Sequence, residues 1–306
     1  MKKTVLVTGS SGMIGTALCE RLISEGFEVI GVDRVSNRWS QAVDQKTVLA
    51  DLRKPDALEK ISKKPDFFIH LAANAYVFNS VQNPQLAIDN ILMTLNCLEF
   101  CRKKKISRFL FSSSREVYGN NSKQPSSEAD VDISGTESPY AASKVSAESF
   151  ISSYHFSFGI DYQIIRFSNV YGRYDDSDRL IPLLIRLNKK KEAITIFGKE
   201  KELPFTFLDD AVEAVILLIQ KFEFAKNRSF NIAPEKPTRL LKVAELLAQK
   251  MGVKPKLVLA RPRTGEVIRF SADVSKAKKL LGFVAQTPIE RGLDQTLEWY
   301  SQNGFA

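Results

Sequence analysis

The sequence predicts an α/β protein with a doubly wound parallel sheet and a smaller C-terminal α/β lobe. Short β-branched, apolar runs alternate with helical stretches as far as residue 168, as in parallel strands joined by crossover helices. A glycine-rich turn directly follows the first of these runs. From residue 169 the alternation loosens without a clear linker, so we expect two partly interleaved domains, residues 1–168 and 169–306.

The N-terminal segment combines a strand, a glycine turn and a helix. Thr4–Thr8 is a β-branched run that predicts a buried strand, and residues 16–25 predict a helix. Between them stand Gly9, Gly12 and Gly15, spaced every third residue. In such a turn the backbone N–H groups and the helix dipole point at an anion, and the absent side chains let a pyrophosphate approach. The pattern predicts a dinucleotide site.

An acidic residue ends the second predicted strand, which covers residues 28–32. Asp33 stands 18 residues after Gly15. This is close to the spacing of about 20 residues at which an acid accepts hydrogen bonds from the adenosine ribose. Because its carboxylate would repel a 2′-phosphate, the sequence predicts NAD rather than NADP. Arg34 and Arg38 could accept that phosphate, but we expect both in a solvated loop.

The other elements follow in the order of a parallel sheet covered by helices on both faces. In the first domain, strands are expected at residues 47–50, 67–71, 108–112 and 162–167, and helices at 84–104 and 138–158. In the C-terminal lobe, strands are expected at residues 194–197, 203–208 and 228–232, and helices at 180–191, 209–222, 239–251, 274–281 and 288–302. Ligands of such sheets bind beyond the carboxyl ends of the strands.

A tyrosine and a lysine stand four residues apart in the helix predicted at 138–158. Residues at i and i+4 share one helical face, so Tyr140 and Lys144 are expected side by side. An ammonium beside a phenol favours the phenolate, which lowers the tyrosine pKa from its usual value of about 10. Such a tyrosine could exchange a proton with an alcohol near neutral pH.

Together these motifs resemble those of extended short-chain dehydrogenases/reductases, and specifically of the nucleotide-sugar epimerase and dehydratase family of the UDP-glucose 4-epimerase type. The resemblance covers essentially all 306 residues. It is carried by Thr8–Gly15, Asp51-Leu52, His70–Ala73, Asn90, Phe111–Ser114, Val117–Gly119, Tyr140 with Lys144, and Arg166–Gly172. It implies a Rossmann domain that binds NAD and a lobe that binds a nucleotide-diphosphate sugar.

The resemblance also implies roles for individual residues. It assigns proton transfer to Tyr140, with Lys144 keeping it acidic and bonding the nicotinamide ribose, and with Ser114 orienting the sugar hydroxyl. The expected cofactor contacts are Gly9, Gly12, Met13, Ile14, Gly15, Asp33, Asp51, Leu52, Leu71, Ala72, Ala73, Asn90, Ser112, Tyr140, Lys144 and Phe167. The expected substrate contacts are Arg115, Asn169, Ile196, Phe197, Arg263 and Glu266.

In this family NAD takes hydride from a sugar carbon while the tyrosine removes the proton of its hydroxyl, which gives a keto-sugar. If the sugar turns over before hydride returns, the centre inverts; if water leaves first, the sugar is dehydrated. We expect an epimerase acting at C4 through a transient 4-keto-sugar. Two alternatives stay open, a nucleotide-sugar 4,6-dehydratase and a catalytically silent NAD-sensing protein. The intact Ser114, Tyr140 and Lys144 argue against the second.

The two residues after Ser114 match neither reaction cleanly. Dehydratases of the family place an acid at the position of Glu116, where it could deprotonate a carbon beside the keto group. Several dehydratases carry a second acid at the position of Arg115. The arginine that stands there in this chain is a poor proton donor. Glu116 is therefore a candidate catalytic residue, or else the partner of Arg115 or Lys144. Arg115 could instead pair with a carboxylate on the sugar, as in a uronic acid.

The C-terminal lobe matches the family in part. Arg263–Glu266 resembles a segment whose arginine clamps the pyrophosphate, and Ile196–Gly198 resembles the segment along the nucleotide base. Leu203–Phe205 stands where the family has Arg-Asp-Phe, so a second phosphate-binding arginine is missing. Lys201 or Arg269 could compensate for it.

Composition narrows the function classes. Three cysteines without metal-ligand spacing indicate neither a metal site nor a disulfide framework, and no apolar run approaches the length of a membrane span. The net charge of +9 comes from short basic runs at predicted helix ends, which disfavours nucleic acid as a partner and suits an anionic substrate. We expect a cytoplasmic enzyme without a metal. By resemblance it is a homodimer formed through the helices at 84–104 and 138–158.

Overall fold

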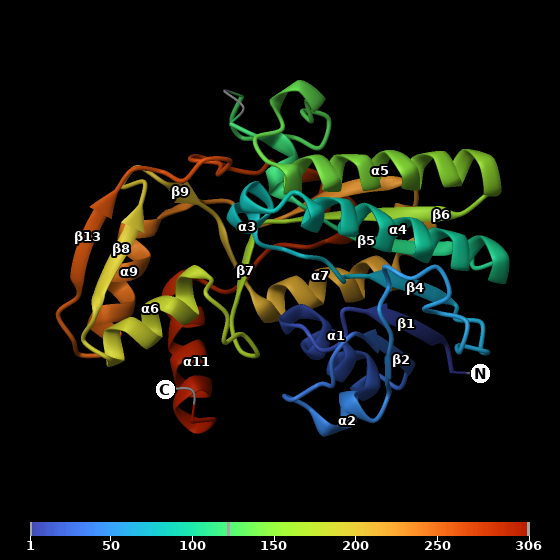
Figure 1. The fold of residues 1–306 in the computed structure, drawn as a ribbon, viewed down its shortest axis with the longest axis horizontal. Coiled ribbons are helices and arrows are strands. Elements are labelled where there is room, and N and C mark those ends of the chain that lie inside the picture. Colours follow the sequence, from blue (N-terminus) through green and yellow to red (C-terminus); the bar gives the residue numbers. More distant parts are fainter. Residues whose placement is uncertain (1, 121–122, 305–306) are drawn as a thin grey trace.

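A seven-stranded parallel sheet forms the centre of the computed structural model, which describes residues 2–120 and 123–304 (Figure 1). From one edge to the other it contains β11 (Arg228–Ile232), β6 (Asp161–Phe167), β5 (Arg108–Ser114), β4 (Phe67–His70), β1 (Thr4–Thr8), β2 (Glu28–Asp33) and β3 (Thr47–Leu49). The strand order reverses between β1 and β4, and a reversal opens a crevice at the carboxyl ends of the strands. The predicted doubly wound parallel sheet is confirmed.

Helices cover both faces of this sheet. Alternate residues of β1 point to opposite faces: Val5 and Val7 pack with α1 (Met13–Ser24) and α7 (Leu208–Gln220), whereas Leu6 packs with α4 (Gln85–Lys104) and α5 (Pro139–Phe158). The side chains on both faces of the sheet are buried, which explains why the strands are continuous apolar runs in the sequence. Figure 1 shows α4 and α5 lying side by side over one face, with α1 and α7 over the other.

Local sequence sets where the functional elements begin and end. Helix α1 begins at Met13, three residues before its predicted start, because Gly12 takes an extended conformation and caps it. Helix α5 begins after Ser138, whose side chain accepts a hydrogen bond from the N–H of Ala141, and Pro139 occupies its first turn. Strand β5 runs two residues beyond its predicted end, so that Ser114 pairs with Phe167 at the carboxyl edge of the sheet.

The C-terminal lobe has its own apolar core, to which α6 (Leu180–Lys189), α9 (Leu240–Lys250) and α11 (Ile289–Gln302) contribute. A parallel pair, β8 (Ala193–Phe197) and β13 (Lys256–Ala260), lies at the end of the lobe remote from the large sheet (Figure 1). Strand β13 was not predicted, because Leu257–Leu259 shows no alternation of apolar and polar residues.

The strand predicted at 203–208 is wrong as a single element. Strand β9 (Glu202–Leu203) pairs with β12 (Thr238–Arg239), and β10 (Phe205–Phe207) pairs with β7 (Asn169–Tyr171). Pro204 separates them because it has no N–H to give to a ladder, and its carbonyl oxygen instead accepts a hydrogen bond from the N–H of Asn169.

Shorter elements complete the chain. They are α2 (Gln41–Asp44), α3 (Val77–Gln82), the 3₁₀ turns Arg115–Tyr118 and Ile133–Gly135, α8 (Phe222–Ala225) and α10 (Ser275–Leu281). Because β11, α7, α8 and α10 come from residues beyond 169 yet belong to the large sheet and its cover, the C-terminal part of the chain interleaves with the first domain. Within the described residues, no helix has both the length and the apolar character that crossing a membrane requires.

Candidate active site

A cavity of about 1250 Å³ runs from the glycine turn after β1, past the carboxyl ends of β4 and β5, into the C-terminal lobe. Pockets for a single small ligand usually have volumes of about 300–1,000 Å³, so this cavity has room for a cofactor and a substrate together. Every residue predicted to act in catalysis, cofactor binding or substrate binding lines it, with the exception of Asn90.

The cofactor end of the cavity is a turn that only glycines can form. Gly9 has a φ of 74°, and a Cβ added to Gly15 would lie 1.9 Å from the carbonyl oxygen of Gly9. The backbone at the N-terminus of α1 is therefore open to the cavity, as pyrophosphate binding requires. Asp33 is held at the end of β2 by the N–H groups of Ser11 (3.0 Å) and Val35 (3.3 Å). These residues fit NAD.

The two arginines near Asp33 differ in their surroundings. Arg38 forms an ion pair with Asp176, and its guanidinium lies 4.3 Å from the centroid of the Trp39 ring. To accept a 2′-phosphate, Arg38 would have to leave both partners. Arg34 is exposed and lines the cavity mouth. The arrangement agrees with the prediction of NAD over NADP.

The structure places Asn90 behind the cavity wall. Its Oδ1 accepts a hydrogen bond from the N–H of Asn74 (2.7 Å), and its Nδ2 donates to Ser143 Oγ (3.3 Å). Asn74 itself lines the cavity. Asn90 thus forms a bridge that joins α4, the loop after β4 and α5 and fixes the wall from outside, and its contact with the cofactor stays a prediction.

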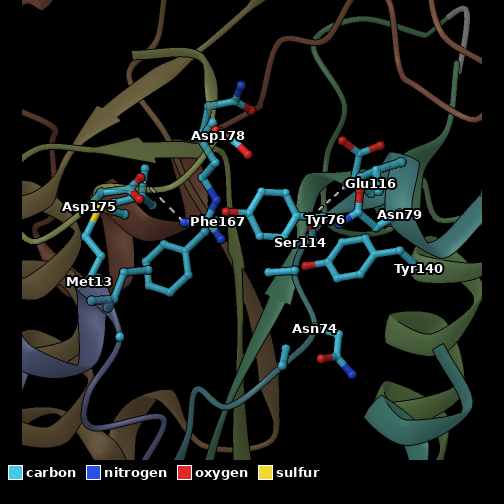
Figure 2. Close-up of a pocket in the computed structure, with 18 of the residues that line it drawn as sticks. Met13, Asn74, Tyr76, Asn79, Ser114, Glu116, Tyr140, Phe167, Asp175 and Asp178 are labelled. Carbon is cyan, nitrogen blue, oxygen red and sulfur yellow. Dashed lines mark hydrogen bonds and ion pairs between the residues drawn. The ribbon is translucent and has the colours of Figure 1, made fainter. Parts of the chain in front are cut away.

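Ser114, Tyr140 and Lys144 meet in the middle of the cavity. Figure 2 shows Ser114 beside the phenolic end of Tyr140. Lys144 Nζ donates to the carbonyl oxygen of Ser112 at 2.7 Å and lies 5.8 Å from the centroid of the Tyr140 ring. The predicted spacing on one helical face thus brings the two side chains to the same strand end.

The pKa values of this group differ from the sequence-based prediction. Burial raises the pKa of Tyr140 to about 12, against the hydrogen bond from Ser114, which lowers it. Burial lowers the pKa of Lys144 to about 8. The predicted lowering of the Tyr140 pKa by Lys144 is wrong for this structure, because desolvation of both groups outweighs their proximity.

Arg115 and Glu116 pair with each other inside the cavity wall. Arg115 Nη2 lies 2.7 Å from Glu116 Oε1, and Arg115 Nε donates to Asn169 Oδ1 at 2.8 Å. The sequence left two partners open for Arg115, namely Glu116 and a carboxylate on the sugar. The structure shows the ion pair with Glu116. Burial raises the pKa of Glu116, and the charge of Arg115 opposes this. Among the described residues, Arg115 Nη1 and Glu116 Oε2 are buried without a hydrogen-bond partner.

At the substrate end, Arg263 lies between two aromatic rings. Its guanidinium is 4.0 Å from the centroid of Phe197 and 4.9 Å from that of Phe78. Glu266 accepts hydrogen bonds from Lys201 Nζ and from the N–H of Arg263. Lys201 lines the cavity, so of the two residues considered as replacements for the missing arginine it is the one that the fold brings to the site.

Several cavity residues escaped the sequence analysis. They are Tyr76 and Asn79 around α3, and Asp175, Asp178 and Arg179 in the loop before α6 (Figure 2). Arg179 lies 5.4 Å from the centroid of Tyr76, and its charge, like that of Arg115, lowers the pKa of Tyr140. Asp175, Asp176 and Asp178, just before the helix predicted at 180–191, were the one available signal, and they carry no recognisable motif.

Within residues 2–120 and 123–304, no group of three or more His, Cys, Asp or Glu side chains is placed to hold a metal ion. Cys19, Cys97 and Cys101 are free thiols inside the core, and burial raises the pKa of each.

The family of the chain follows from comparison with known proteins. Residues 5–233 match the model of the NAD dependent epimerase/dehydratase family. The chain belongs to this family. It is 31% identical to a UDP-glucuronate 4-epimerase of Thermodesulfobacterium geofontis (97% of this chain, 96% of the relative) and 29% identical to a dTDP-glucose 4,6-dehydratase of Haemophilus influenzae (98% of each).

A solved structure shares the whole architecture. The UDP-glucose 4-epimerase of Thermotoga maritima, crystallised with UDP-glucose, superposes with a TM-score of 0.91 at 30% sequence identity, over 98% of this chain and 99% of that one. NAD is thus the cofactor of this chain, and its relatives include both epimerases and dehydratases of nucleotide sugars.

Proposed function

We propose that the protein is a cytoplasmic, NAD-dependent nucleotide-sugar epimerase that inverts C4 of the sugar through a transient 4-keto-sugar. One observation carries the proposal: Ser114, Tyr140 and Lys144 stand between the glycine turn and the C-terminal lobe with its Lys201 and Arg263, in one cavity large enough for both ligands. In this proposal residues 1–168 hold NAD, and residues 169–306 hold the nucleotide diphosphate through Asn169, Lys201 and Arg263.

The protein groups divide the work of proton transfer. NAD, when bound, supplies the hydride acceptor. Tyr140 takes the proton of the C4 hydroxyl and later returns it, and Ser114 hydrogen-bonds the same oxygen. The nearby positive charges of Arg179 and Arg115 lower the pKa of Tyr140 and so offset part of the effect of its burial. The keto-sugar then needs room to present its other face, which the volume of the cavity provides.

Glu116 supports a second candidate, a nucleotide-sugar 4,6-dehydratase. A buried carboxyl with a raised pKa can act as an acid or a base beside a keto group. We rank this reaction second because Glu116 is tied to Arg115, and because Arg115 occupies the place where a second acid would protonate the departing hydroxide. Arginine keeps its proton in proteins.

We further propose that the protein is a homodimer that pairs α4 and α5 with those of a second copy. The two helices pack against each other and leave large apolar side chains half exposed, namely Ile88, Leu92 and Phe150. Light scattering should give twice the mass of the chain, and Leu92→Arg should reduce it to that of a monomer. A single-chain mass for the unmodified protein at micromolar concentration would contradict the dimer.

The reaction is tested by incubating the purified protein with UDP- and dTDP-linked glucose, N-acetylglucosamine and glucuronate. Products are analysed by mass spectrometry and NMR. The proposal predicts a product of unchanged mass with inverted C4. Loss of water would instead establish the dehydratase. Tight NAD binding without conversion of any sugar would establish the sensing protein.

A further inference from the structure

Glu148 continues the row of functional residues along α5. Tyr140, Lys144 and Glu148 stand at i, i+4 and i+8, so they share one face of the helix. Tyr140 and Lys144 reach the end of β5 through Ser114 and Ser112. Glu148 reaches the serine between them, because Ser113 Oγ donates a hydrogen bond to its Oε1 at 2.5 Å.

A second set of bonds fixes the Glu148 carboxylate. Arg166 on β6 binds both of its oxygens, with Nε 3.0 Å from Oε1 and Nη2 2.6 Å from Oε2. The remaining nitrogen of Arg166 donates to the hydroxyl of Tyr118 and to the carbonyl oxygen of Glu128. Side-chain exposure is 12% for Glu148 and 5% for Arg166. The position of this carboxylate is therefore set by β5, β6 and the turn after β5.

We propose that Glu148 is a positioning residue whose negative charge keeps the Lys144 ammonium protonated, with Ser113 and Arg166 holding that charge in place. The inference adds to the proposed function, since it concerns how the proton-transfer pair is maintained. This role accounts for the buried ion pair between Glu148 and Arg166 next to Ser112–Ser114, a place where apolar side chains could pack instead.

The surroundings of Lys144 make Glu148 its counter-charge. On its own helix, Tyr140 is a neutral phenol over the physiological range, since its pKa is about 12. From β4 comes His70, which burial keeps neutral by lowering its pKa to about 3. From β5 come the carbonyl oxygen of Ser112 and the ring of Phe111, whose centroid is 4.7 Å from Nζ. Among these groups the anion is Glu148.

Pairing with Arg166 does not cancel the effect of Glu148. Burial lowers the pKa of Lys144, and the charge of Glu148 raises it, although the same carboxylate is bound by Arg166. Other charges near the Arg166 end are paired among themselves, since Glu128 lies 3.2 Å from Lys276. Because burial lowers the pKa of Lys144, the charge of Glu148 opposes the loss of the ammonium proton.

The experiment compares Glu148→Gln with Ser113→Ala. Glutamine keeps the size of the side chain and an oxygen for Ser113, but removes the charge. Alanine at 113 removes a hydrogen bond of Glu148 and keeps the charge. The holoenzyme is labelled with a small amine reagent, acetic anhydride, over a pH series, and acetylation of Lys144 is quantified by mass spectrometry. The alkaline limb of kcat against pH is measured on the same proteins.

Removal of the charge should move the Lys144 titration, and with it the alkaline limb, to lower pH by about one unit, whereas Ser113→Ala should leave both in place, because the charge remains and Arg166 still binds both carboxylate oxygens. If glutamine leaves an unpaired arginine that prevents folding, the double variant Glu148→Gln/Arg166→Gln removes both charges and should still move the titration to lower pH, but by less, because loss of the arginine charge acts in the opposite direction. An unmoved titration in a folded Glu148 variant, or an equal shift in Ser113→Ala, would overturn the proposal. Labelling of Lys144 needs no sugar substrate. Its outcome therefore tests the role of Glu148 separately from the proposed epimerase reaction.

Discussion

Arg115 and Glu116, neighbours in the sequence, form an ion pair in which Nη2 lies 2.7 Å from Oε1 and only 8% and 7% of the two side chains are exposed. Such a pair contributes little net stability, because desolvation of both charges offsets their attraction. Loss of one partner is a different matter, since it leaves a buried charge without compensation.

The pair predicts an asymmetric effect of substitution on stability. Arg115→Met should lower the free energy of unfolding by about 3 kcal/mol, the scale of a broken buried ion pair, because Glu116 is left unpaired. Arg115→Met combined with Glu116→Gln should recover at least half of that loss. Urea denaturation of the three proteins measures both values. If the double variant is as unstable as the single one, the pair does not govern stability at this site.

Tyr140→Phe should reduce turnover about 100-fold or more, the effect of losing a general acid–base group. Affinity for NAD should stay nearly unchanged, and Ser114→Ala should cost less than the tyrosine substitution. Tyr154→Phe is a matched control on the same helix, because its hydroxyl bonds Glu99. Near-normal turnover in Tyr140→Phe would remove this residue from the mechanism and favour the NAD-sensing alternative.

Cofactor titrations test the environment of Asp33. The unmodified protein should bind NAD more tightly than NADP, since the carboxylate at the end of β2 repels a 2′-phosphate. Asp33→Asn should narrow that preference, and Arg38→Gln should leave it unchanged, because Arg38 is already engaged by Asp176 and Trp39. Tighter binding of NADP to the unmodified protein would show that the arginines dominate.

The buried His70 should make the folded protein less stable in acid. Burial lowers its pKa from 6.5 to about 3, so below pH 6.5 the unfolded chain takes up a proton that the folded chain refuses. Its contribution is complete above pH 6.5 and is lost progressively as the pH falls toward 3, by up to about 5 kcal/mol. Unfolding free energies at pH 7 and pH 4 should differ less in His70→Gln than in the unmodified protein. The control is His155→Gln, at the other histidine; an equal pH dependence in all three would contradict the assignment.

The sequence made visible those parts of the site that place strict demands on the backbone. Gly9 and Gly15 tolerate no side chain, and Asp33 must end a strand, so these positions are fixed in spacing as well as in type. The i, i+4 relation of Tyr140 and Lys144 is likewise a property of any helix. The alternation of strands and helices predicted a parallel, doubly wound sheet with helices on both faces.

Other features depend on contacts that local sequence does not encode. Asn90 faces Asn74 and Ser143 rather than the cavity, which is a matter of how α4 docks on α5. The pKa of Tyr140 rises because of its burial, and burial is a product of the whole fold. Arg179 reaches the site from a loop whose path is set by packing of the C-terminal lobe.

The fate of the hydrogen at C4 tests the central claim most directly. UDP-glucose and dTDP-glucose carrying deuterium at C4 are incubated with the protein, and the products are analysed by mass spectrometry and NMR. A C4 epimerase removes this hydrogen and returns it to the same carbon on the opposite face, so the product should have unchanged mass, inverted C4 and deuterium still at C4. Loss of water with deuterium transferred to C6 would contradict the account and assign the chain to the dehydratases.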